Sequence, residues 1–123
     1  MAYTEALPCI SMPVAADYSA KQYYIMKTAS GVATLCGDGE EPIGVLQNAP
    51  DAANEVGRIG IGRGVTKVVA GAAITVSAKV AAMAGGLAAP ATSGEAVLGY
   101  AMEAATASGD VISVLLISAE SPA

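Results

Sequence analysis

The same pattern occurs twice in this chain, 55 positions apart, in residues 40–61, EEPIGVLQNAPDAANEVGRIGI, and in residues 95–116, EAVLGYAMEAATASGDVISVLL. In each stretch an acidic residue precedes an apolar residue and a glycine, and a loop follows. A second acidic residue and a valine then begin a run that ends in spaced apolar positions. The matched positions are Glu40 and Glu95, Ile43 and Leu98, Gly44 and Gly99, Ala49 and Ala104, Glu55 and Asp110, Val56 and Val111, Ile59 and Val114, and Ile61 and Leu116.

Each copy of the pattern predicts a strand, a surface loop and a return strand. The glycine in the first strand permits another backbone to approach closely. Two similar hairpins favour a β architecture. The alternative is chance similarity, because alanine, valine and glycine are so common in this sequence.

Outside these hairpins, short runs of β-branched and aromatic residues alternate with turn signals such as GDGEEP at 37–42. Alanine favours helices, but glycines interrupt residues 57–99 too often for a long one. We therefore expect an all-β fold, a small β-barrel or sandwich of short strands. At most one or two short helical turns fit, near residues 52–54 or 78–83.

A length of 123 residues suits one domain. We expect an extended N-terminal arm at 1–17, a single β domain at 18–118 and a polar tail at 119–123. Pro8 and Pro13 favour extended backbone in the arm. Its apolar residues indicate that it either packs on its own domain or waits for a partner.

The composition argues against most enzyme classes. The chain has no histidine, so it has no Ser-His or Cys-His pair and no histidine-ligated zinc. We expect no catalytic residues, no metal and no cofactor. A core rich in alanine buries little area per side chain, which favours an oligomer.

The charge and the hydropathy pattern limit the partners. A net charge of −5 argues against nucleic acid, and no segment has the length and composition of a membrane span or a signal peptide. Cys9 and Cys36 could pair, but a reducing compartment with two free thiols is the favoured interpretation.

Two motifs have structural explanations that we prefer. IGIGRG at 59–64 would bind a dinucleotide only if it opened a helix, whereas a strand follows it. Asp38, Glu40 and Glu41 could ligate calcium, but their spacing does not fit a helix-flanked calcium loop, and a solvated turn explains them.

Several motifs in order resemble those of the capsid decoration, or cement, proteins of tailed bacteriophages. The resemblance spans residues 17–117, with one departure at Ser77 and Ala78, where a turn with glycine and an acidic residue is expected. It rests on YSAKQYYIMK at 18–27, PIGVLQNAP at 42–50, TKVVAG at 66–71, VLGYAMEAA at 97–105 and DVI at 110–112.

The resemblance implies a structural virion protein rather than an enzyme. Such a protein binds the outer surface of the expanded icosahedral head, cements neighbouring major capsid subunits and is typically a homotrimer. It is located on the outer capsid of the virion, and in the host cytoplasm during assembly. The resemblance also implies a capsid-binding arm, which in this chain comprises Ala2, Tyr3, Leu7, Ile10, Met12 and Val14.

Four tyrosines are candidates for the subunit interface, because tyrosine suits both interfaces and cores that lack bulk. They are Tyr18, Tyr23, Tyr24 and Tyr100. The alternative function is a head-fibre base or a module that displays loops to host surfaces or glycans. That function favours an exposed aromatic platform, and five tyrosines without tryptophan offer little for one.

Overall fold

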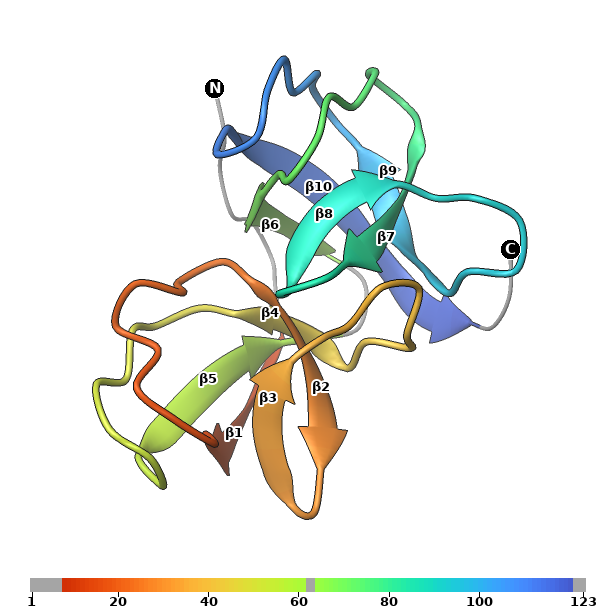
Figure 1. Ribbon diagram of the computed structural model, residues 1–123. Helices are drawn as coiled ribbons and strands as arrows, with labels where there is room; N and C mark the ends of the chain where they lie inside the picture. The colour runs from red at the N-terminus through yellow and green to blue at the C-terminus, as the bar shows by residue number, and fades with distance from the viewer. Residues whose placement is uncertain (1–7, 62–63, 121–123) are drawn as a thin grey trace.

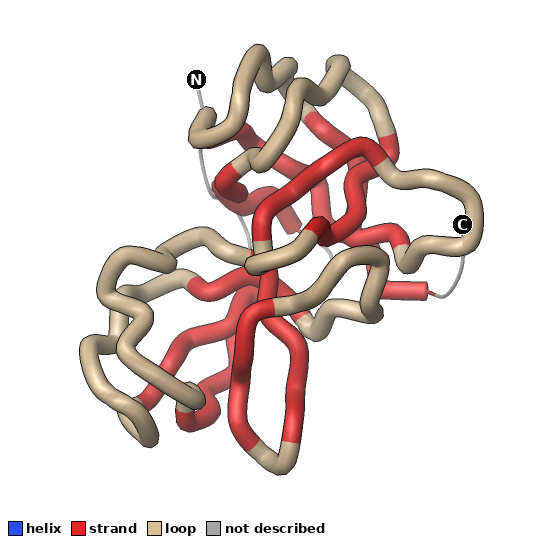
Figure 2. The backbone as a smooth tube through the Cα atoms, in the orientation of Figure 1, coloured by secondary structure: helices blue, strands red, loops and turns tan. Residues whose placement is uncertain are grey.

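A computed structural model describes residues 8–61 and 64–120, and this part of the chain is built from strands and loops without a helix (Figures 1 and 2). The strands are β1 (Cys9–Pro13), β2 (Ile25–Ala29), β3 (Val32–Leu35), β4 (Gly44–Leu46), β5 (Val56–Gly60), β6 (Gly64–Val69), β7 (Lys79–Met83), β8 (Leu87–Pro90), β9 (Val97–Ala101) and β10 (Val111–Glu120).

The strands form two five-stranded antiparallel sheets with one shared topology. The first sheet has the order β1-β5-β4-β2-β3 and the second has the order β6-β10-β9-β7-β8. Neither sheet closes into a barrel, so the fold is sandwich-like, and the prediction of an all-β fold of short strands is confirmed. The alanine-rich segment 78–83, one of two places with room for a helical turn, contains β7 instead, because its residues pair with β8 and β9.

The repeat extends to the backbone of the turns. Every described residue with positive φ has a counterpart in the other half of the chain, which chance similarity would not produce. We call residues 9–60 the first repeat and residues 64–120 the second repeat. The pairs are Ser30 and Gly85, Gly31 and Gly86, Gly39 and Gly94, and Asn54 and Gly109 at an offset of 55, and Tyr23 and Ser77 at an offset of 54.

Side chains also repeat their contacts with the backbone. In the first repeat, Asn48 Oδ1 accepts a hydrogen bond from Arg58 N at 2.9 Å. In the second, Glu103 Oε1 accepts one from Ser113 N at 2.9 Å. The same loop is thus closed by an amide in one repeat and by a carboxylate in the other.

The hydrophobic core consists of two clusters, and the larger one contains residues of both repeats. One cluster lies within the first repeat and includes Val14, Tyr18 and Ile59. The larger cluster belongs mostly to the second repeat, yet it includes Ile25 and Val45 from the first. The two repeats therefore pack as one body.

The contact between the repeats, which we call the internal joint, inserts the β7–β8 turn beside β2 (Figure 1). Ile25 N donates to Gly86 O at 2.7 Å, and Gly86 N donates to Cys36 O at 2.9 Å. A Cβ at Gly86 would lie 2.8 Å from Ile25 O, so only glycine fits there. Beside it, Gln47 Nε2 donates to Thr66 Oγ1 at 2.8 Å.

Candidate functional site

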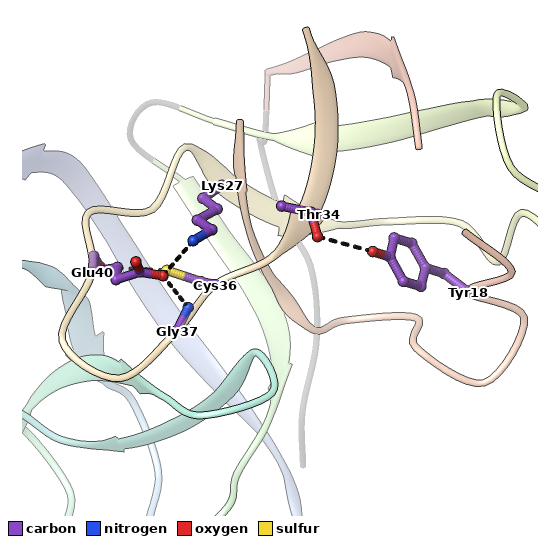
Figure 3. A network of polar contacts seen from close by, with 6 residues as sticks. All are labelled: Tyr18, Lys27, Thr34, Cys36, Gly37 and Glu40. Atoms are coloured by element: carbon purple, nitrogen blue, oxygen red, sulfur yellow. Dashed lines mark hydrogen bonds and ion pairs between the residues drawn. The ribbon is translucent and has the colours of Figure 1, made fainter. Parts of the chain in front are cut away.

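A cluster of polar contacts surrounds the loop after β3 (Figure 3). Lys27 Nζ lies 2.6 Å from Glu40 Oε1, and Gly37 N donates to the same oxygen at 2.7 Å. The hydrogen bond from Lys27 lowers the pKa of the Glu40 carboxyl. The Cys36 thiol donates to Glu40 O at 3.4 Å, and burial raises its pKa to about 11. This cluster therefore holds a loop in place, with its thiol protonated at neutral pH.

Two other chemical candidates also have structural roles. The glycine-rich segment at 59–64 connects β5 to β6, so it lies between two strands and lacks the helix that a phosphate site needs. Within residues 8–61 and 64–120, no three His, Cys, Asp or Glu side chains are grouped so that they could hold a metal ion. Cys36 is a buried free thiol, and it forms no disulfide with Cys9. The part of the chain that the structure describes also has no helix long and apolar enough to cross a membrane.

The predicted capsid-binding arm is divided by the structure. Ala2, Tyr3 and Leu7 lie outside the described residues. Ile10 and Met12 lie in β1, which pairs with β5, and Val14 is buried in the bridge that follows. For residues 9–14, therefore, the chain packs on its own domain, which was one of the two alternatives.

The four predicted interface tyrosines have different surroundings. Tyr18 is buried in the first core, with its hydroxyl 3.2 Å from Thr34 Oγ1 (Figure 3). Tyr23 packs against the larger core cluster and lies under Lys67, whose Nζ is 5.5 Å from the ring centroid. Tyr18 and Tyr23 therefore contribute mainly to contacts within the chain.

Tyr24 and Tyr100 are more accessible. Tyr24 is half-buried, with Lys21 Nζ 4.9 Å above its ring. Tyr100 lies on β9 and is 36% exposed. Of the four tyrosines, Tyr100 offers the most surface to a partner.

Tyr100 belongs to an exposed apolar surface that we call the β9 patch, formed by Val76, Tyr100 and Met102. Met102 lies two positions after Tyr100, at the bend that ends β9, and its N–H donates to Ser113 O on β10 at 2.8 Å. Val76 lies close by, because its neighbour Ser77 donates its N–H to Ala101 O at 2.8 Å. Sequence reasoning identified only Tyr100 here. The spacing of Met102 from Tyr100 is the signal that would have added the methionine.

The chemistry of the β9 patch suits a protein partner. Lys79 pairs with Tyr100 across β7 and β9, and its side chain is exposed. An aromatic and a methionine beside one cation form an adaptable apolar surface without a convergent acid–base set. Such a surface binds by burying apolar area.

Comparisons with known proteins cover nearly the whole chain. A family model described as phage cement protein matches residues 9–116. Among solved structures, the N base of head fiber gp8.5 from bacteriophage phi29 has a TM-score of 0.71 at 18% sequence identity, over 92% of this chain and 98% of that chain. A search of curated proteins finds no match to the sequence. At that identity the structural likeness shows a shared fold.

Proposed function

Because the chain belongs to the phage cement protein family, we propose that it binds the outer surface of the expanded icosahedral head and cements neighbouring major capsid subunits. Membership makes it a structural, capsid-associated protein and a component of the virion. The observation that carries the proposal is the extent of the match, which runs from the first residue of β1 into β10.

The proposed partners are the major capsid protein and further copies of this chain, as a homotrimer. The negative net charge favours protein partners over nucleic acid. We propose no catalysis and no cofactor for a chain of this family. It would accumulate in the host cytoplasm during assembly and then occupy the outer capsid.

A trimer would strengthen weak contacts with the shell. When three binding segments are carried on one particle, the second and third bind at a high effective concentration. Residues 1–7 precede β1 and are the proposed arm, since residues 9–13 already pair in the first sheet and Val14 is buried after them. Each arm then needs only a modest affinity for the capsid.

The test is the addition of purified protein to expanded heads that lack it. We expect saturable binding at a fixed ratio to the major capsid protein, measured by cosedimentation and gel densitometry. The decorated heads should retain their DNA at higher temperature than bare heads. Compact, unexpanded heads serve as the control and should bind much less. Failure to bind expanded heads at any concentration would contradict the proposal.

The second candidate function is a head-fibre base, and the shared fold with the phi29 head fiber base favours it. Electron cryomicroscopy of decorated heads separates the two functions. A low density that contacts several capsid subunits supports cement, whereas a projecting fibre supports a fibre base. Binding of the isolated protein to host cells or to a glycan array would instead support the display function.

A further inference from the structure

The internal joint uses a different surface of each repeat. The first repeat contributes the start of β2, β4, and the end of β3 with the loop that follows it. The second contributes β6, β7 with the β7–β8 turn, and the residue before β9. This is a head-to-tail contact, because a two-fold contact would use the same residues from both repeats. Each repeat therefore has one surface buried in the joint. It also has a second surface, equivalent to the one that the other repeat buries there, which the joint does not use.

In the internal joint, the first repeat receives the β7–β8 turn of the second repeat. The surface equivalent to this receiving surface lies on the second repeat and is unused. Pairing between β7 and β9 repeats the pairing between β2 and β4, and the bond from Ala91 N to Lys79 O at 2.9 Å repeats that from Cys36 N to Ile25 O at 3.0 Å. The first-repeat residues are covered by the second repeat, while most of their equivalents face outward. The equivalent pairs are Ile25 and Lys79, Cys36 and Ala91, Val45 and Tyr100, and Gln47 and Met102.

The surface that enters the joint is formed by the β7–β8 turn and β6. Its equivalent lies on the first repeat, in the β2–β3 turn and β1, and is unused. Gly31 in the β2–β3 turn corresponds to Gly86 when the turns are aligned on β3 and β8, with φ of 84° against 80°. The β7–β8 turn is one residue longer, because Ala29 pairs with Val32 whereas Met83 pairs with Leu87. Its turn lies at the end of the molecule far from the second repeat (Figure 1), and a Cβ at Gly31 would meet nothing within 4 Å. Ile10 is equivalent to Thr66, since they pair with Ile59 and Val114, which are 55 positions apart.

The side chains at these unused positions match one another. In the internal joint a polar pair meets, Gln47 with Thr66. At the equivalent positions both side chains are apolar and exposed, Met102 by 45% and Ile10 by 41%. Brought together as in the internal joint, these two would cover each other.

Exposed positions outside the joint behave differently. Val56 and Val111 are equivalent residues, and both remain exposed, by 59% and 45%. Equivalent residues therefore differ in exposure where one of the two lies in the internal joint, and they are both exposed where neither does.

We propose that copies of this chain bind head to tail by repeating the internal joint. The β2–β3 turn of one copy enters the second repeat of the next, so that Gly31 meets Lys79 and Ala91, and Ile10 meets Met102. This inference rests on the proposed homotrimer and names its interface. A head-to-tail contact that closes after three copies gives a ring of six repeats.

The contact between copies is weaker than the internal joint. Val69 N donates to Tyr23 O at 3.1 Å within the chain. The residue equivalent to Val69 is Pro13, which has no N–H to donate. A weaker joint between chains is consistent with exposed side chains in the free protein.

The substitution G31N tests the proposal. Asparagine tolerates positive φ, and its side chain meets open space in the single chain. Between copies it would collide with the backbone of the next chain, as a Cβ at Gly86 would with Ile25 O. Sedimentation velocity should show a trimer for the wild type and a threefold lower mass for G31N. The matched control is G109N. A Cβ at Gly109 also meets open space, and the equivalent position in the first repeat is already an asparagine, Asn54. Because Gly109 lies outside the joint, G109N should remain trimeric.

A second pair of variants tests the receiving side. M102K and V111K add the same charge at side chains with the same 45% exposure. We expect M102K to be monomeric with an unchanged circular dichroism spectrum, and V111K to be trimeric. A wild type that stays monomeric at about 1 mM, or G31N and M102K chains that both remain trimers, would overturn the proposal.

Binding to heads is measured separately from the oligomeric state. If wild type binds expanded heads while G31N and M102K remain trimers, the proposed function stands and this interface is wrong. If those variants become monomers while wild type fails to bind heads, the interface stands and the proposed function is wrong.

Discussion

At the residue scale, one glycine in each repeat allows two strands to approach. A Cβ at Gly44 would lie 2.0 Å from Gly60 O, and a Cβ at Gly99 would lie 2.1 Å from Leu115 O. Neither glycine has positive φ, so the requirement is space rather than backbone conformation. These two glycines are the pair that the sequence pattern places 55 positions apart.

We predict that G44A and G99A are each destabilising, by about 3 kcal/mol or more, because the added methyl group meets backbone that cannot move aside. Urea denaturation followed by circular dichroism measures the effect. The two losses should be similar, since the positions are equivalent. G109N is the control and should cost about 1 kcal/mol or less. Losses below about 0.5 kcal/mol at Gly44 and Gly99 would contradict this assignment.

Residue types alone did not separate the tyrosines. Tyr18 and Tyr23 are candidates for the subunit interface, and within the single chain both rings also pack against core residues. An aromatic ring satisfies a core and an interface in the same way. Only the position of each ring relative to distant strands distinguishes the two roles.

At the element scale, β1 shows what local sequence leaves open. Prolines at 8 and 13 predict extended backbone, and Cys9–Pro13 is indeed extended. Its pairing partner is β5, with Cys9 opposite Gly60. Pro13 fits because β1 is an edge strand, where a missing N–H is tolerated. No local signal connects segments so far apart in the chain.

We predict different outcomes for two deletions at the N-terminus. Removing residues 2–7 should leave the melting temperature within about 2 °C of wild type and should abolish binding to expanded heads. Removing residues 2–14 should destabilise the fold by several kcal/mol, because it deletes β1 and the fully buried Val14. Thermal melts and head cosedimentation measure the two effects. Normal head binding by the shorter deletion would exclude the arm.

At the scale of the whole molecule, the two repeats share the larger of the two core clusters. Ile25 and Val45 are fully buried, and they lie in the cluster that belongs mostly to the second repeat. An alanine-rich core buries little area per residue, so losing this contact would strongly lower the stability of each repeat. The same shortage of bulk is the reason to expect further stabilisation from neighbouring copies.

We predict that the whole chain unfolds in a single transition. Scanning calorimetry should give equal calorimetric and van't Hoff enthalpies. G86N should lower the stability of both repeats together, because a Cβ at that position collides with Ile25 O. The equivalent substitution G31N should leave the stability of the single chain nearly unchanged. Two separate transitions in the wild type would show that the repeats fold independently.

The all-β class, most of the turns and the internal repeat were predictable from the sequence, since alternation and turn chemistry are local properties. Not every strand was predictable, because residues 78–83 had room for a helical turn and contain β7. The sequence also indicated the family, through motifs spread over residues 17–117. Contacts in the tertiary structure place residues 9–13 in the first sheet, bury Tyr18, pack Tyr23 against the larger core cluster and join the repeats head to tail. The physical reason is that pairing and burial depend on contacts between distant segments, and two repeats of one pattern can be joined in more than one way.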